Sequence, residues 1–145
     1  MAMDEMLSAA RNLACQQAIH RFYAALDTGD FATLAAAMAP DGIWHRQGRA
    51  LRGPGDVAQA MAERPAKRVT AHLMLNLMVD LQDGETATAR YNTLVFRHDG
   101  PAGAPPPAPL GLPLSIAAAQ DRLRRDSATG AWLVVERRSS RVFGA

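Results

Sequence analysis

The stretch Val69-Thr-Ala-His-Leu-Met-Leu-Asn-Leu-Met-Val-Asp-Leu81 is apolar on both of its alternating sides. Side chains of a regular strand point to opposite faces in turn. One face would then carry Leu73, Leu75, Leu77 and Val79, and the other His72, Met74, Asn76 and Met78. An antiparallel strand with one face in water alternates apolar and polar residues. This strand therefore predicts a sheet covered on both sides, by helices on one face and by a second copy of the chain on the other.

Three more strands are predicted after this one, over residues 86–98, 114–125 and 132–142. Asp83-Gly84 marks the first hairpin turn, and the turn ending at Gly130 marks the last. Residues 101–113 contain six of the nine prolines, which excludes a central strand. We expect this segment to be a solvated, proline-rich loop.

Helical patterns precede the sheet. Apolar residues recur with a helical period over 3–26, and shorter helices are predicted over 31–38 and 57–63. Asp30 and Asp56 stand where they would cap the second and third helix. Short strands are expected at 43–46 and 49–52. Helices followed by an antiparallel sheet predict an α+β fold, and 145 residues predict one domain over 1–145.

The composition is that of a soluble globular protein, with 48% apolar and 21% charged residues. No apolar run is long enough to span a membrane, and the acidic start lacks the order of a secretory signal peptide. The single cysteine, Cys15, cannot form an internal disulfide. We therefore expect a cytoplasmic protein with no membrane partner.

Fifteen of the sixteen basic residues are arginines, and six of these lie in the last 24 residues. Such a cluster can neutralise phosphates. However, the segment carries no helix-turn-helix and no RNA-binding aromatic motif. We interpret these arginines as a solvated face of two neighbouring strands and expect no nucleic-acid partner.

Five segments together resemble a known family: Tyr23-Ala-Ala-Leu-Asp-Thr-Gly-Asp-Phe31, Ala39-Pro-Asp-Gly-Ile-Trp44, Gly53-Pro-Gly-Asp-Val57, Arg68-Val-Thr-Ala-His-Leu-Met-Leu-Asn76 and Asp83-Gly-Glu-Thr-Ala87. They look like the SnoaL-like group of the nuclear-transport-factor-2-like superfamily, which includes scytalone dehydratase, ketosteroid isomerase and polyketide cyclases. The resemblance is clear over residues 10–98. It implies a cone, in which a strongly curved sheet wraps around helices, with a pocket inside and a dimer interface on the outer sheet face.

Asp27 and His72 are the candidate catalytic residues. Asp27 lies at the end of a helix, where the macrodipole and an apolar pocket would raise its pKa and make it a base; alternatively, it bonds local backbone N–H groups of a turn. His72 could carry protons with Asp27 beside it; alternatively, it is a core histidine bonded to the backbone. The resemblance places both residues in the pocket.

Six further residues are candidate binding residues: Tyr23, Trp44, His45, Met74, Asn76 and Tyr91. Tyr23 lies one helical turn before Asp27 and could donate to a substrate oxygen or pack in the core. Trp44 and His45 are neighbours on a strand, so which of them faces inward stays open. Tyr91 stands where scytalone dehydratase has its second histidine, and Leu26 where that enzyme has a tyrosine. These two differences argue against scytalone as the substrate.

No metal site or cofactor is expected. The four histidines show no metal-binding spacing, and no Gly-rich phosphate loop follows a strand. The first hypothesis is a small cofactor-independent lyase or isomerase, in which Asp27 and His72 remove a proton from a hydrophobic cyclic ketone or a similar small molecule. Tyr91, Tyr23 or His45 would stabilise the oxyanion that develops. The alternative is a non-catalytic module that binds a hydrophobic small molecule or a protein partner.

Overall fold

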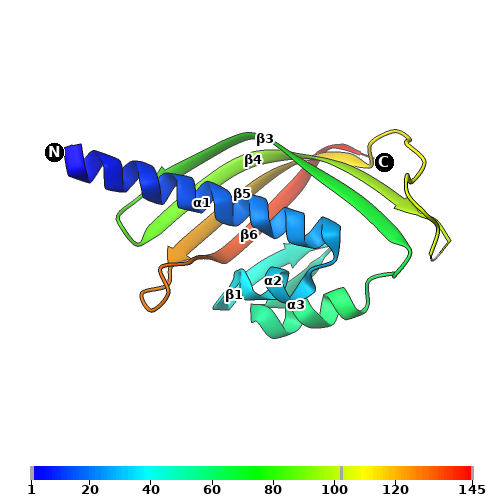
Figure 1. The fold of residues 1–145 in the computed structure, drawn as a ribbon, viewed down its shortest axis with the longest axis horizontal. Coiled ribbons are helices and arrows are strands. Elements are labelled where there is room, and N and C mark those ends of the chain that lie inside the picture. The colour runs from blue at the N-terminus through cyan, green and yellow to red at the C-terminus, as the bar shows by residue number, and fades with distance from the viewer. Residues whose placement is uncertain (1, 102, 145) are drawn as a thin grey trace.

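The computed structural model describes residues 2–101 and 103–144 as three helices on the concave side of one curved, six-stranded sheet (Figure 1). Along the chain the elements are α1 (Ala2–Thr28), α2 (Phe31–Ala36), β1 (Met38–Arg46), β2 (Arg49–Arg52), α3 (Gly53–Ala62), β3 (Arg68–Leu81), β4 (Thr86–Asp99), β5 (Ser115–Arg125) and β6 (Trp132–Gly144). The strand order is β2-β1-β6-β5-β4-β3. The predicted α+β fold, with N-terminal helices in a curved and mainly antiparallel sheet, is confirmed.

The long helix α1 crosses the sheet, while α2 and α3 lie together beside β1 (Figure 1). Only the second half of α1 enters the core, through Cys15, Ile19, Phe22 and Leu26, which recur at helical spacing. The apolar stripe expected along the whole helix is wrong for its first half, because Leu13 is 56% exposed. The first half of α1 therefore presents apolar side chains to solvent.

A turn between α1 and α2 fixes the end of α1. Gly29 has a φ of +78°, a left-handed conformation that glycine adopts without steric cost. Asp30 then caps α2, as predicted, by accepting a hydrogen bond from the backbone N–H of Thr33 at 3.3 Å. The next helix differs: Asp56 lies inside α3, where its carboxylate accepts from the backbone N–H of Arg52 at 2.9 Å.

The strand β1 is longer than predicted and pairs with β6 in parallel. The sequence analysis predicted a helix over 31–38, whereas the structure begins the strand at Met38 and shifts the register between Met38 and Ile43. This irregularity accommodates a proline that cannot donate to the ladder. It also brings Gly42 against the carbonyl oxygen of Val134, where a Cβ would collide.

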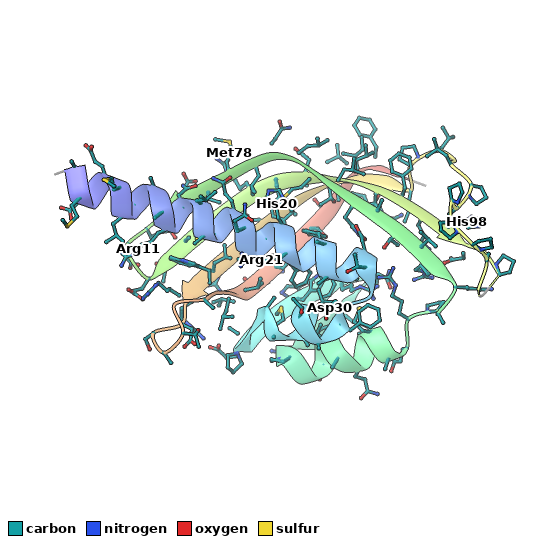
Figure 2. The ribbon with its side chains drawn as sticks, in the orientation of Figure 1. Arg11, His20, Arg21, Asp30, Met78 and His98 are labelled. Carbon is teal, nitrogen blue, oxygen red and sulfur yellow. The ribbon has the colours of Figure 1, made fainter. Side chains whose placement is uncertain are left out.

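A bulge in β3 changes the expected division of its two faces. The register with β4 shifts between Leu75 and Met78, and Asn76 takes a φ of +56°. Leu77 then packs on the core, on the same side as Met74, while Met78 projects from the outer face, 56% exposed (Figure 2). The predicted alternation is therefore wrong beyond Leu75.

A second bulge, in β6, turns an arginine inward. Leu123 pairs with Val134 but Arg122 pairs with Glu136, so β6 carries one extra residue at this point. As a result, Val134 and Arg137 are both buried although they are three positions apart, a spacing that would place them on opposite faces of a regular strand. The interpretation of the C-terminal arginines as a solvated face is wrong for Arg137, which is 1% exposed.

The proline-rich segment has no helix or strand in its described residues, as expected of a loop. It connects β4 to β5, and the side chains of Leu110 and Leu112 are 87% and 93% exposed. No helix in the described part of the chain is long and apolar enough to cross a membrane.

Candidate active site

A pocket of about 590 Å³ opens inside the curve of the sheet, beside the end of α1. Helix α1 supplies Tyr23 and Leu26 to its wall, and β1 supplies Trp44 and His45. The inner faces of β3 to β6 form the remaining wall, through residues that include Thr70, His72, Thr93, Ser115, Ala117 and Arg137. Several titratable groups therefore meet at one cavity, which is the general form of a small-molecule site.

His72 lines this pocket, whereas Asp27 lies outside the pocket wall and is in direct contact with His72. The Nδ1 atom of His72 lies 2.6 Å from Oδ1 of Asp27, and the backbone N–H of His72 donates to Oδ2 at 2.7 Å. Thr70 donates its hydroxyl hydrogen to Oδ1 at 2.8 Å. Helix α1 ends beside the start of β3, so residues 45 positions apart in the sequence form one hydrogen-bonded unit.

These hydrogen bonds control the pKa of Asp27. Burial by itself would raise it, but the hydrogen bonds from the side chain and backbone of His72 and from Thr70 outweigh that effect and lower the pKa below its ordinary value of 3.8. The expectation of a raised pKa is therefore wrong. Asp27 is a carboxylate near neutral pH, which makes His72 the candidate base.

Arg64, in the segment after α3, stabilises the hydrogen-bonded unit of Asp27, Thr70 and His72. Its guanidinium donates to the hydroxyl of Thr70 at 2.8 Å and to the carbonyl oxygen of Leu26 at 3.3 Å. Thr70 thus accepts from Arg64 and donates to Asp27, so both roles of its hydroxyl are used. The side chain of Asp27 is therefore held by Thr70 and His72 of β3, and Thr70 is held in turn by Arg64.

A second buried network lies on the other side of Tyr23. Arg137 donates through Nε and one terminal nitrogen to the two carboxylate oxygens of Asp121, at 2.8 and 2.6 Å. Tyr91 donates to the same carboxylate at 3.1 Å, and the hydroxyls of Tyr91 and Tyr23 lie 2.9 Å apart. Because Tyr91 uses its hydrogen on Asp121, Tyr23 must donate to Tyr91.

Burial sets the protonation of this network. It raises the pKa of Tyr23, and that of Tyr91 well above its ordinary value, so both phenols are neutral near pH 7. Burial would lower the pKa of Arg137, but the charge of Asp121 outweighs it and the guanidinium stays protonated. Neither tyrosine can act as a base here.

Arg137 keeps one donor unused. Its second terminal nitrogen, Nη1, is buried and has no hydrogen-bond partner in the described structure. The guanidinium lies 3.8 Å from the ring centroid of Phe22 and 4.8 Å from that of Tyr23. A buried N–H without a partner is costly, and this one belongs to a side chain that borders the pocket.

The amino-acid sequence matches the family model described as SnoaL-like domain over residues 8–138. The chain belongs to the SnoaL-like family.

Solved structures with the same fold accompany this match to the SnoaL-like family. A proposed dehydratase of the NTF2-like family from Streptomyces avermitilis is 19% identical, with a TM-score of 0.74, and 94% of this chain and 99% of that one are covered. A ketosteroid isomerase-like protein from Erwinia carotovora atroseptica is 18% identical, with a TM-score of 0.71 and coverage of 91% and 96%. A protein from Catenulispora acidiphila, solved in complex with S-DNPA, is 24% identical, with a TM-score of 0.68 and coverage of 92% and 94%. No curated protein sequence matches the chain significantly.

The remaining binding candidates of this SnoaL-like protein occupy different positions. Trp44 and His45 both border the pocket, although they are neighbours on one strand. Trp44 is buried against Phe22 at 5.0 Å between ring centroids, whereas the half-buried His45 contacts Glu136 at 3.0 Å. Both side chains therefore contribute to the pocket wall, Trp44 through its ring and His45 at the pocket edge.

Three candidates lie outside the pocket wall. Tyr91 is buried behind Tyr23 and contacts its hydroxyl rather than the cavity. Met74 is half-buried and packs against the core. Asn76 is exposed on the bulge of β3, with its amide 3.4 Å from Oδ1 of Asn92, so its placement in the pocket is wrong.

The sequence analysis missed four residues of the site: Arg64, Thr70, Asp121 and Arg137. Asp121 had a detectable sign, because it occupies an inward position in the alternation Ala117, Ala119, Asp121, Leu123 of β5. A single carboxylate among inward apolar residues requires a buried partner. Arg137 had no such sign, because the β6 bulge decides its direction.

The described residues, 2–101 and 103–144, contain no group of three His, Cys, Asp or Glu side chains that could hold a metal ion. Cys15 is buried in the core, and burial raises the pKa of its thiol to about 12, so it is not a nucleophile at neutral pH.

Proposed function

We propose that this SnoaL-like protein is a small cofactor-independent enzyme of the lyase or isomerase type. It removes a proton from the carbon next to a carbonyl group of a cyclic ketone or a similar small molecule. The observation that carries the proposal is the 2.6 Å contact between Asp27 and Nδ1 of His72, with the imidazole on the wall of a pocket. A base held by a carboxylate at a cavity is the arrangement that general base catalysis needs.

His72 is the base in this mechanism. Because Asp27 is ionised, Nδ1 of His72 carries the hydrogen of their contact, and Nε2 keeps its lone pair. Nε2 takes the substrate proton, and the imidazolium that forms is stabilised by the adjacent carboxylate. The proton then returns to another carbon in an isomerisation, or leaves with a departing hydroxyl group as water in a dehydration.

Arg137 is the group that stabilises the developing oxyanion. The sequence offered Tyr91, Tyr23 or His45 for this role. Tyr91 lies behind the pocket wall, and the hydroxyl hydrogen of Tyr23 is used on Tyr91. Arg137 is a fixed positive charge bordering the same cavity, and its guanidinium and the His72 ring both lie next to the Tyr23 ring, at 4.8 and 5.3 Å. A fixed positive charge close to developing negative charge stabilises an enolate.

Proton exchange tests this function directly. Wild-type protein in D2O is incubated with a panel of cyclic ketones, and deuterium uptake at the α-carbon is followed by NMR. We expect uptake for at least one compound, and His72→Gln should slow it about a hundredfold or more. His20→Gln, an exposed histidine on α1, is the matched control and should leave the rate unchanged (Figure 2).

A compound that binds in the pocket but exchanges no proton, in wild type and His72→Gln alike, would contradict the enzyme proposal. The protein would then be the alternative, a binding module for small molecules, because binding would not depend on the base.

We also propose that the protein forms a homodimer through the outer face of the sheet. Val69, Leu73, Leu75 and Met78 all project outward from β3, and each is about half exposed in the single chain. A contiguous apolar face on a sheet is a common protein–protein contact. A second copy covers the face without requiring any other partner.

A further inference from the structure

Arginines form a large part of the pocket wall. Six of them line it: Arg46, Arg64, Arg68, Arg97, Arg137 and Arg141. They come from β1, β3, β4, β6 and the segment after α3. Asp and Glu are absent from the described lining. A cleft lined by one sign of charge focuses the field on whatever enters it.

The nearby carboxylates do not balance this charge. Asp99 accepts from both Arg68 at 2.9 Å and Arg97 at 2.8 Å, so one negative charge serves two positive ones. The carboxylates of Asp27 and Asp121 are engaged by His72 and Arg137. The pocket therefore retains a net positive charge after its internal pairs are counted.

Arg46 lacks a carboxylate partner. Among the described residues it makes no ion pair, although it is half-buried at the end of β1. Its guanidinium lies 5.5 Å from the ring centroid of Trp44, which helps to hold it at the pocket. Burial, followed by the charges of Arg64 and Arg68, lowers its pKa. An anion next to Arg46 would relieve this repulsion.

Arg137 adds a fixed positive charge at the same cavity. Its guanidinium and the ring of His72 both lie next to Tyr23, at 4.8 and 5.3 Å. The Arg137 guanidinium is buried against Asp121 and Phe22, so Arg46, and not Arg137, is the guanidinium that a ligand can reach.

We propose that the pocket is built for an organic carboxylate, whose carboxylate group binds to Arg46. The identity of this molecule as a substrate rests on the proposed function, whereas its binding does not. The apolar ketone expected from the sequence is thereby replaced by an acidic one, with its ring between Trp44 and Tyr23.

A matched pair of probes tests the charge preference. 2-Naphthoate and 2-naphthamide share a ring system and differ in charge, and their binding is measured by calorimetry at low ionic strength. We expect the wild type to bind the acid about tenfold more tightly than the amide or better. Arg46→Met should remove most of this preference, and Arg46→Lys should keep part of it.

Arg21→Met is the matched control. Arg21 is exposed on α1 and does not line the pocket (Figure 2). This variant should keep the full preference. Equal binding of acid and amide to the wild type, or an equal loss in Arg21→Met, would overturn the proposal. Tighter binding of 1-naphthyl phosphate than of 2-naphthoate would overturn the assignment to a carboxylate.

His72→Gln separates this inference from the proposed function. Binding of the carboxylate does not need the base, so the preference for 2-naphthoate should persist in this variant. A wild type that prefers the acid but exchanges no substrate proton would leave the binding proposal standing and contradict the enzyme proposal. A wild type that exchanges protons but binds acid and amide equally would contradict the binding proposal and leave the enzyme proposal standing.

Discussion

At the scale of single residues, the charge of Asp27 decides what His72 can do. Three hydrogen bonds converge on its carboxylate and lower its pKa, although burial opposes them. An ionised Asp27 keeps the hydrogen of His72 on Nδ1 and stabilises the imidazolium. If Asp27 were protonated, it could not do either.

The lowered pKa of Asp27 predicts how its contribution to stability depends on pH. The folded-state pKa lies below the ordinary value of 3.8, so the unfolded chain binds the proton more readily. The contribution is fully present above the unfolded-state pKa and is lost as the pH falls through the folded-state value. The difference in unfolding free energy between wild type and Asp27→Asn should therefore shrink as the pH is lowered below about 4.

Urea unfolding at a series of pH values measures this difference, with Asp4→Asn, an exposed change in the first turn of α1, as the baseline. A difference that stays constant from neutral to strongly acidic pH would mean that the carboxylate of Asp27 does not gain stability from its partners.

The buried pair of Arg137 and Asp121 predicts a large effect of a single substitution. Asp121→Leu leaves a fully buried guanidinium without its carboxylate and should destabilise the protein by about 3–5 kcal/mol. Adding Arg137→Met removes the stranded charge, so the double variant should recover much of that loss. Urea unfolding of the three proteins checks this, and a double variant less stable than Asp121→Leu would contradict the account.

At the scale of elements, two bulges place the site. The bulge in β3 switches which face of the strand meets the core, and the bulge in β6 turns Arg137 into the pocket. Each follows from one extra residue in a ladder, and each increases local bending of the strand. The two bulges thus contribute both to the curvature of the sheet and to the direction of its inner side chains.

The bulge in β3 makes a prediction about Asn76. Its φ of +56° is tolerated by Asn and favoured by Gly, but a β-branched residue there is strained. Asn76→Val should lower the unfolding free energy by about 1–2 kcal/mol, whereas Asn76→Gly should leave it unchanged or raise it. Thermal unfolding compares the two variants; equal stability would argue against a left-handed residue at this position.

The sequence predicts the regular parts of these elements and misses the irregular ones. The four long strands and the helix that ends at the turn of Gly29 follow from periodicity and turn chemistry, and Asp27 with His72 follows from the family resemblance. The parallel pairing of β1 with β6 and both bulges depend on contacts between distant strands, which a local pattern does not contain. For this reason Asn76 was misplaced and Arg137 was missed.

At the scale of the whole molecule, one face of the sheet is left open. The inner face covers α1 and the pocket, while the outer side of β3 exposes Leu73, Leu75 and Met78 (Figure 2). A second chain on the outer face would explain why β3 is apolar on both of its faces.

The proposed dimer predicts that Leu75→Lys dissociates it. A charge at the centre of a buried apolar face is costly, so the variant should sediment as a monomer at concentrations where the wild type is a dimer. Leu7→Lys, on α1 and 46% exposed like Leu75, is the matched control and should stay dimeric. A wild type that sediments as a monomer at all concentrations would contradict the dimer itself.

The most direct test of the central claim is the protonation state of the His72 ring, read by ¹⁵N NMR at a pH where the ring is neutral. The account predicts a hydrogen on Nδ1 and a bare Nε2 in the wild type, and a loss of this preference in Asp27→Asn. A hydrogen found on Nε2 in the wild type would leave the pocket without its base and contradict the account.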